Sequence, residues 1–241
     1  MSRTRPLTKT MLNRRQSLKT MAAAGAACLM PTIIPASALG RGGAVAPSER
    51  IVLGGIGLGP RGEFDLKWML RESDVQFVAI CDARRVRREA IKQIADRHYG
   101  NSDCKMYPEM KEFLATRNDI DAVLIATGDR WHSLATIMAM RAGKDVYSEK
   151  PSCMTIAEGR EVVETARRYG RIYQTGVQRL SEAPFVMAIE MARAGRLGQV
   201  HTVRAHIAPW DAAEMSHAWL PEEPLPSKEE VDWDALSLIH I

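Results

Sequence analysis

The segment RIVLGGIGLGPRG, residues 50–62, joins a short apolar run to a glycine-rich turn. Its glycines follow the pattern Gly57-x-Gly59-x-x-Gly62. The first glycine of this pattern allows a tight turn, the second lets the backbone approach a pyrophosphate, and the third lets the next helix pack closely on the strand. Because the pattern follows a predicted strand and opens a predicted helix, it indicates a dinucleotide-binding site.

Apolar runs and amphipathic segments alternate on the C-terminal side of this turn. Strands are predicted at residues 50–57, 74–80, 120–127, 144–148 and 171–177, and helices at residues 62–72, 84–100, 108–116, 131–143 and 155–170. Near-continuous apolar strands that alternate with helices are typical of a parallel sheet covered on both faces. The sequence therefore predicts an α/β fold with a Rossmann-type doubly wound parallel sheet.

Details of three predicted helices indicate how they pack and where they begin or end. The first helix carries Phe64, Trp68 and Met69 on one side, which makes that side its predicted apolar face. Gly100 is placed to end the second helix in the left-handed conformation. The last helix begins with a capping box, Thr155 to Glu158, which satisfies backbone N–H groups of its first turn.

The pattern changes after residue 176, which indicates a domain boundary. A helix is predicted at residues 183–198, an alternating strand at 199–207 and a Pro-rich acidic loop at 220–235. We predict an NAD(P)-binding Rossmann domain at residues 49–176. Residues 177–241 are predicted to be part of an α+β domain for substrate binding or oligomerisation, with its own sheet.

Residues 1–38 have the features of an export signal. They contain six basic residues and no acidic one, with the pair Arg14-Arg15 followed by an apolar stretch and the small residues of 36–38. This order predicts a twin-arginine signal peptide with cleavage after Ala38, although an ordinary amphipathic first helix is the alternative. We expect residues 39–48 to be a linker. The protein is expected in the periplasm or otherwise exported, without stable membrane insertion after signal removal.

The charge balance and the spacing of cysteines and histidines argue against nucleic-acid binding and against a metal site. The chain has 241 residues and a formal net charge of +4. Without residues 1–38, 27 of the 33 basic residues remain against 29 acidic ones, a net charge of −2. That balance gives no overall positive field for nucleic acid. Cys81, Cys104 and Cys153 form no Cys-x-x-Cys pair, and no histidines show His-x-x-x-His spacing, so no metal site is predicted.

An acidic residue stands where a dinucleotide site needs one. Asp82 lies 20 residues after Gly62, at the end of the second predicted strand. A carboxylate there accepts hydrogen bonds from ribose hydroxyls and repels a 2′-phosphate, which favours NAD. Arg84 and Arg85 follow and keep NADP possible, because they are able to pair with the 2′-phosphate. Their alternative role is a basic helix start facing water.

Two further strand ends carry polar groups. Thr127 and His132 follow the strand of residues 120–127, on the edge of the sheet where ligands bind. They are predicted to line the nicotinamide end, although His132 fits equally well as a helix-start residue with a local hydrogen bond. Glu149 and Lys150 end the next strand, before a proline that keeps Lys150 from helical dihedral angles. A structural turn lysine is the alternative.

As an ordered set, these motifs resemble the Gfo/Idh/MocA family of glucose–fructose oxidoreductases, inositol dehydrogenases and rhizopine-catabolism proteins. The resemblance implies that Lys150 lies at the catalytic centre, that Glu149 belongs to the same motif and that Asp82 is the ribose-binding acid. Gly128 departs from the family, whose exported members commonly have proline there. The set comprises Gly57 to Gly62, Cys81-Asp82, Ala126-Thr127, His132, Glu149-Lys150-Pro151 and the segments YQTGVQR and AGRLGQV.

The resemblance implies an exported NAD(P)-dependent oxidoreductase that transfers a hydride between a sugar or polyol hydroxyl and the nicotinamide. A lysine beside a cationic nicotinamide has its ammonium form disfavoured, so Lys150 is suited to relay the hydroxyl proton. The alternatives are an NAD-dependent glycosidase of the same family and a non-catalytic nucleotide-binding fragment. No Asp-x-x-x-His motif follows Lys150, and the ending LSLIHI is unlike the family, so we expect a truncated chain. A complete protein is a possible homo-oligomer.

Overall fold

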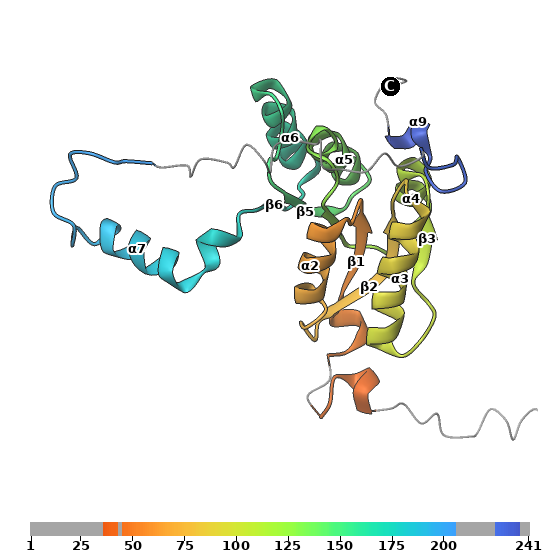
Figure 1. The fold of residues 1–241 in the computed structure, drawn as a ribbon. Helices are drawn as coiled ribbons and strands as arrows, with labels where there is room; N and C mark the ends of the chain where they lie inside the picture. The colour runs from red at the N-terminus through yellow and green to blue at the C-terminus, as the bar shows by residue number, and fades with distance from the viewer. Residues whose placement is uncertain (1–35, 43–44, 206–224, 237–241) are drawn as a thin grey trace, which may run out of the picture. The chain divides into compact units, whose positions relative to one another are not determined.

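The computed structural model describes residues 36–42, 45–205 and 225–236 (Figure 1). The chain divides into two units, Met1–Pro47 and Ser48–Ile241. Within the first unit, the short 3-10 helix η1 (Ala36–Leu39) is described, and a second, η2 (Pro47–Glu49), spans the boundary. The predicted signal peptide lies outside the described residues except for residues 36–38.

One six-stranded sheet forms the centre of the second unit. Its strands are β1 (Ile51–Ile56), β2 (Val75–Cys81), β3 (Lys105–Tyr107), β4 (Ala122–Ile125), β5 (Asp145–Glu149) and β6 (Tyr173–Gly176). They lie in the order β3-β2-β1-β4-β5-β6, and every neighbouring pair is parallel. The chain winds outward from β1 to β3 and then returns to place β4 beside β1. This is the doubly wound arrangement, whose ligand crevice opens where the strand order reverses.

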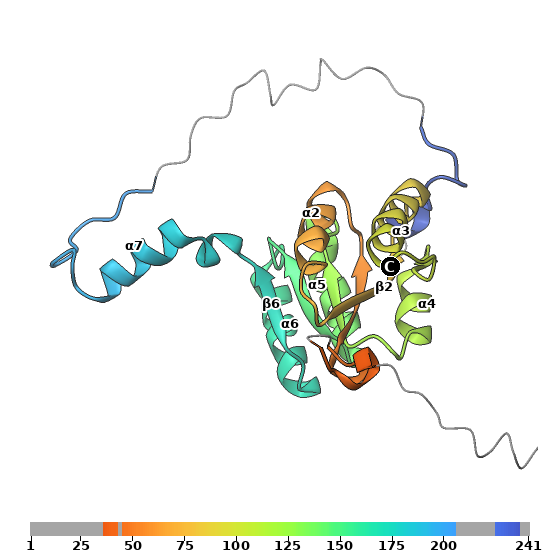
Figure 2. The same cartoon turned by 90° about the horizontal axis from the view of Figure 1, so that it is seen from below.

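Helices cover both faces of the sheet, which confirms the predicted fold class. They are α2 (Pro60–Met69), α3 (Arg85–Tyr99), α4 (Met110–Thr116), α5 (Asp129–Arg141) and α6 (Ile156–Tyr169). One core joins Leu66 and Ile91, from α2 and α3, to Phe77 of β2. The other joins Phe113 of α4, Met140 of α5 and Val162 of α6. In Figure 2, α2 and α3 accordingly lie on one side of the sheet and α4 and α6 on the other.

Two predicted helix ends are present as expected. Gly100 ends α3 with φ +67°, in the left-handed region that favours glycine. Thr155 caps α6, and its side chain accepts a hydrogen bond from the Glu158 N–H at 3.2 Å. The Glu158 carboxylate instead accepts hydrogen bonds from the Met154 N–H and the Ser133 hydroxyl. The box therefore also ties α6 to α5.

The predicted apolar face of α2 is wrong for Phe64 and Trp68, whereas its third residue, Met69, packs against the core. Phe64 and Trp68 are 51% and 54% exposed, whereas the helix buries Gly62, Asp65 and Leu66. The glycine pattern sets this orientation, because Gly62 must face the sheet for the helix to approach it closely. The two exposed rings are covered in part by guanidinium groups, at 5.0 Å from Arg61 to Phe64 and 4.0 Å from Arg71 to Trp68.

Strand β3 is absent from the sequence prediction. It has three residues, and its first two side chains are exposed, so it offers no apolar run. It forms through pairing with β2 at the edge of the sheet. Short exposed edge strands carry little periodicity of their own, and their neighbours define them.

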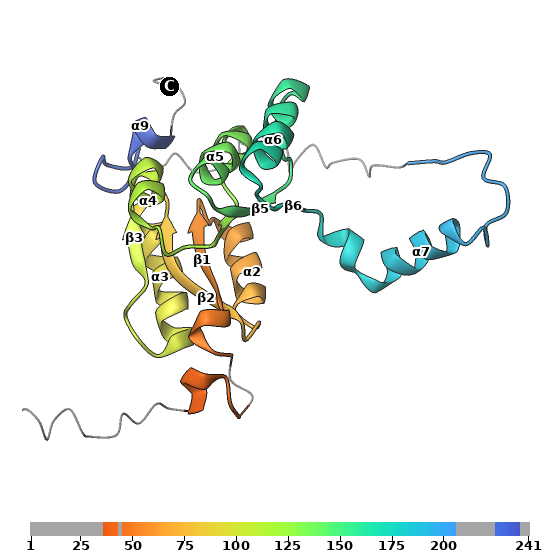
Figure 3. The same ribbon diagram turned by 180° about the vertical axis from the view of Figure 1, so that it is seen from behind.

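The region after β6 differs from its prediction in two places. Helix α7 (Ala183–Arg193) is present and has no buried residue. The strand predicted at 199–207 is not a strand over its described residues, 199–205. A strand needs a paired neighbour, and no described strand pairs with this segment. The predicted acidic loop is described from residue 225 and contains the short helix α9 (Trp233–Leu236), which Figure 3 shows from behind.

Candidate active site

A cleft of about 920 Å³ lies at the carboxyl edge of the sheet. It is lined by the turn after β1, by the segments after β2, β3 and β4, and by the C-terminal residues 232–236. The polar and aromatic side chains that line it include Arg61, Asp82, Arg84, Arg87, Glu109, Lys111, Thr127, Trp131, Asp232 and Asp234. Because the cleft opens where the strand order reverses, it occupies the position expected for a dinucleotide in this fold.

The glycine-rich turn has no room for side chains at two of its positions. Gly57 has φ +66°, and a Cβ atom there would lie 2.3 Å from the Thr127 side chain. At Gly62 a Cβ atom would lie 2.8 Å from Leu58 and 2.9 Å from Ala126. Gly57 therefore permits the turn, and Gly62 lets α2 approach the end of β4.

Gly59 differs from the other two glycines because the space beside it is open. No atom lies within 4 Å of the position that its Cβ atom would take. Gly59 is also the N-cap residue of α2, and no side chain caps this helix end. Uncapped N–H groups at a helix N-terminus attract anions. The open space and the uncapped helix end together fit a pyrophosphate.

Asp82 lines the cleft at the end of β2. Its Oδ1 accepts a hydrogen bond from the Arg84 N–H at 2.8 Å, and the Arg88 guanidinium donates to its backbone carbonyl. Burial raises the pKa of Asp82, while the Arg84 N–H and the Arg88 guanidinium oppose the rise. No described residue donates a hydrogen bond to Oδ2. Asp82 is therefore held by its neighbours with one carboxylate oxygen left for a ribose hydroxyl.

Replacing Asp82 by alanine is expected to weaken NAD binding by roughly 10- to 150-fold. The change removes a charge-assisted acceptor, whose contribution is about 1.5–3 kcal/mol. Asp82→Asn is the matched control, because it keeps the shape and the Oδ1 acceptor but removes the charge. Its NAD affinity should lie between those of wild type and Asp82→Ala. Calorimetric titration with NAD measures all three proteins, and equal affinities would remove Asp82 from the site.

The basic residues after Asp82 divide into two groups. Arg84 and Arg87 line the cleft. Arg85 does not line it: its guanidinium lies 3.9 Å from Glu89, and its N–H donates to the Glu230 carbonyl at 2.9 Å. Sequence reasoning missed Arg87. The available signal was helical spacing, which places Arg84 and Arg87 on the same side of the first turn of α3.

The tip of β5 is held by a buried carboxylate. Glu149 is 3% exposed, and its Oε1 lies 3.1 Å from the Arg61 Nε. Its Oε2 accepts a hydrogen bond from the Lys150 N–H at 3.1 Å, and the Lys150–Pro151 peptide bond is cis. The Lys150 side chain is exposed, and its ammonium has no hydrogen bond to a described residue. Glu149 thus positions the backbone of Lys150 and leaves the ammonium for a ligand.

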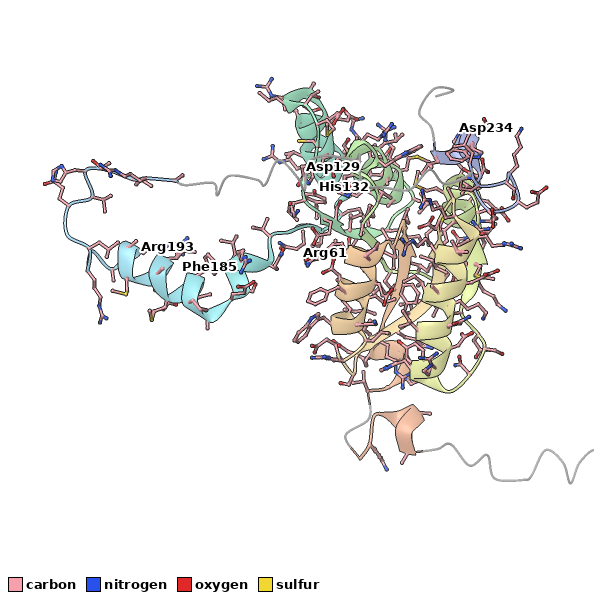
Figure 4. The ribbon with its side chains drawn as sticks, in the orientation of Figure 1. Arg61, Asp129, His132, Phe185, Arg193 and Asp234 are labelled. Atoms are coloured by element: carbon pink, nitrogen blue, oxygen red, sulfur yellow. The ribbon has the colours of Figure 1, made fainter. Side chains whose placement is uncertain are left out.

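His132 is 2% exposed and is not among the residues that line the cleft. Its Nδ1 lies 2.7 Å from the Pro151 carbonyl oxygen and its Nε2 lies 3.1 Å from the Thr127 carbonyl oxygen. The ring therefore joins the segments after β4 and β5. Its contact with the Thr127 carbonyl is the local hydrogen bond expected of a helix-start histidine. Figure 4 shows His132 near the start of α5 and Arg61 at the start of α2, along the same edge. A direct contact of His132 with the nicotinamide stays a prediction.

Sequence reasoning also missed Asp65, which no motif contains. Its Oδ1 lies 2.7 Å from the Arg61 Nη2, and its buried Oδ2 has no hydrogen-bond partner in the described part of the chain. Burial raises the pKa of Asp65 to about 6; Arg61 opposes the rise and the Glu149 carboxylate adds to it. Tyr147 of β5 is a further titratable neighbour. The carboxyl groups of Asp65 and Glu149 thus share the Arg61 guanidinium, which lies between the glycine-rich turn and the end of β5.

Asp65 is expected to make the fold less stable as the pH rises from about 4 to about 7. Its folded-state pKa of about 6 lies above the ordinary value of 3.8, so the folded protein holds this proton more tightly than the unfolded chain. Stability is therefore full below the ordinary pKa and is lost as the pH rises through the folded-state pKa. The asparagine in Asp65→Asn does not titrate. The melting temperature of this variant minus that of wild type should therefore increase by roughly 2–10 °C between about pH 4 and about pH 7.

Thermal melts at several pH values measure that difference. Glu63→Gln is the matched control, since it removes a more exposed carboxylate from the same helix. A difference between Asp65→Asn and wild type that stays constant with pH would contradict the prediction.

Three other features of the described residues bear on the function. No group of three or more His, Cys, Asp or Glu side chains within them is arranged to hold a metal ion. None of their helices is both long and apolar enough to cross a membrane. Cys81, Cys104 and Cys153 are free thiols, the first two buried.

Known proteins are similar to this chain in sequence. A Glycosyl hydrolase family 109 protein of Shewanella pealeana is 29% identical over 219 residues, which are 81% of this chain and 46% of the relative. An alpha-N-acetylgalactosaminidase of Shewanella oneidensis is 29% identical over 190 residues, 73% of this chain and 39% of the relative. The chain thus spans less than half the length of these curated relatives.

A solved structure and a family model also match this chain. The myo-inositol 2-dehydrogenase of Lactobacillus plantarum is 27% identical with a TM-score of 0.56, over 63% of this chain and 43% of that chain. The model of the Gfo/Idh/MocA family, described as an oxidoreductase family with an NAD-binding Rossmann fold, matches residues 50–177. The chain belongs to the Gfo/Idh/MocA family of NAD-binding oxidoreductases.

Proposed function

We propose that the protein is an exported NAD-dependent oxidoreductase that acts on a hydroxyl group of a sugar or polyol. The observation that carries the proposal is the position of Lys150 at the carboxyl end of β5. β5 is two strands away from β1, whose carboxyl end leads into the glycine-rich turn. When bound, NAD supplies the hydride acceptor. The lysine and the phosphate-binding turn therefore share one edge of one sheet.

The residues of the chain divide the work at this edge. Gly59 and the N-terminus of α2 bind the phosphates, and Asp82 binds a ribose hydroxyl. Lys150 holds the substrate hydroxyl, and its exposed, flexible side chain accepts or relays the hydroxyl proton as the neutral amine. Glu149 fixes the Lys150 backbone, and Arg61 in turn fixes Glu149.

A glycosidase that uses NAD transiently is the second candidate. The relatives named Glycosyl hydrolase family 109 protein and alpha-N-acetylgalactosaminidase support it. Both candidates need the same phosphate and ribose contacts and the same lysine. Their difference lies in the fate of the electrons, since only the oxidoreductase leaves reduced cofactor at the end of the reaction.

One assay separates the candidates. The natural full-length protein is incubated with NAD and a panel of sugars, polyols and chromogenic N-acetylgalactosaminides. Stoichiometric NADH with an oxidised product supports the oxidoreductase. Release of the chromophore without net NADH supports the glycosidase. Intact NADH binding with neither product would reduce the protein to a nucleotide-binding module.

Export is part of the proposal and rests on residues 1–38. The twin Arg14-Arg15, the acid-free basic start and the small residues before the predicted cleavage site support it. Fractionation of cells that produce the protein tests it, with the mass of the mature chain. An uncleaved protein in the cytoplasm would contradict export and leave the proposed reaction untouched.

A further inference from the structure

The C-terminal segment of residues 225–236 returns to the cleft and pairs with the backbone that follows Asp82. The Arg85 N–H donates to the Glu230 carbonyl at 2.9 Å, and the Asp232 N–H donates to the Ala83 carbonyl at 3.2 Å. Between them, Arg84 and Val231 form an antiparallel bridge. Val231 is 3% exposed, so the contact includes a buried side chain as well as backbone hydrogen bonds.

The same segment is tied to the opposite wall of the cleft. The Trp131 indole, on the first turn of α5, donates to the Leu236 carbonyl at 3.3 Å. Figures 1 and 3 show α9 beyond the carboxyl edge of the sheet, next to α3 and α4, and Figure 4 shows Asp234 at this end. The segment therefore spans the cleft from the end of β2 to the start of α5.

This segment changes the charge of the cleft around the residues that follow Asp82. The segments after β2 and β3 contribute three basic side chains, Arg84, Arg87 and Lys111, and two acidic ones, Asp82 and Glu109. Residues 225–236 add the carboxylates of Asp232 and Asp234 to the lining. They convert an excess of one positive charge at this end into an excess of one negative charge.

We propose that Asp232 and Asp234 are specificity-determining residues that make this site select NAD over NADP. The inference rests on the NAD-linked function proposed above and names a determinant of its cofactor choice. NADP differs from NAD by a 2′-phosphate, which carries close to two negative charges at neutral pH. Arg84 and Arg87 alone would attract that phosphate. The two carboxylates on the segment repel it and offset the arginines.

Asparagine variants test the proposal. Asp232→Asn/Asp234→Asn removes both charges and keeps the side-chain volume, and asparagine preserves the N-terminal capping preference at the start of α9. Glu229→Gln/Glu230→Gln is the matched control, because it removes two exposed carboxylates from the same segment outside the cleft lining. The measurement is the ratio of the dissociation constants for NADPH and NADH, by fluorescence titration at low and high salt.

The aspartate variant should shift this ratio toward NADPH by about 5- to 20-fold at low salt, and less at high salt, because screening weakens the repulsion. The glutamate variant should leave the ratio near that of wild type. Unchanged emission of the Trp131→Phe and Trp233→Phe difference spectra, taken against the parent protein, shows that the segment stays docked.

An unchanged ratio in the aspartate variant, or an equal shift in both variants, would overturn the proposal. A wild-type protein that prefers NADPH would overturn it as well. Absence of binding of either dinucleotide to wild type would overturn the cofactor assignment itself and this inference with it.

Discussion

Replacing Lys150 by alanine is expected to lower turnover by roughly 10²–10⁴-fold and to leave NAD affinity nearly unchanged. The factor is the usual loss for a missing proton-transfer group. The affinity should survive because the proposed phosphate and ribose contacts come from Gly59 and Asp82, whereas Lys150 does not line the described cleft. Initial rates on the best substrate of the panel, together with NADH titrations, measure the two effects separately.

Two further variants sharpen this test. Lys150→Arg should not restore turnover, because a guanidinium stays protonated and has a planar shape. Lys67→Ala is the matched control, since Lys67 lies on α2, pairs with Glu63 and is outside the cleft lining. Turnover that survives Lys150→Ala would make Lys150 a turn lysine, and the catalytic proton would need another carrier.

The second large effect is expected at Gly57. Gly57→Ala should lower the free energy of unfolding by roughly 2–5 kcal/mol, the sum of two terms. A non-glycine residue in the left-handed region costs about 1–2 kcal/mol, and overpacking against Thr127 costs about 1–3 kcal/mol. The clash is set by the 2.3 Å approach of the new Cβ atom to Thr127. Denaturant unfolding measures the loss.

Two other glycines separate these terms. Gly100→Ala has the same backbone problem, with φ +67°, but open space around the new Cβ atom, so it should show the first term alone. Gly59→Ala has neither problem in the free protein and should unfold like wild type. It should nevertheless weaken NAD binding, because its Cβ atom fills the space beside the uncapped end of α2. Equal unfolding energies for the three variants would contradict the assigned role of Gly57.

The parts of the fold that could be predicted from sequence are those fixed by local chemistry. Gly57, Gly59 and Gly62 have the spacing of a dinucleotide-binding turn, and Asp82 stands at the expected distance along the chain from them. Gly100 ends its helix by its own conformational freedom. Such positions form a recognisable pattern along the chain, so a single sequence is enough to identify them.

The rest depended on contacts between distant segments. Asp65 matters because β5 places Glu149 beside it, 84 residues later in the chain. The close approach of Gly62 to Ala126 determines which face of α2 is buried. This contact outweighs the free energy that burial of the Trp68 side chain would contribute. The docking of residues 225–236 on the cleft had no local signal, because backbone pairing with Ala83 and Arg85 leaves no pattern in either segment.

The ion pairs of Arg61 link the two halves of the site energetically. Arg61 lines the cleft beside the glycine-rich turn and also holds Glu149, whose other oxygen accepts a hydrogen bond from the Lys150 N–H. A charge that arrives at one end of this chain of contacts changes the free energy at the other. Thermodynamic linkage then requires symmetry: the factor by which bound cofactor changes substrate affinity equals the factor by which bound substrate changes cofactor affinity.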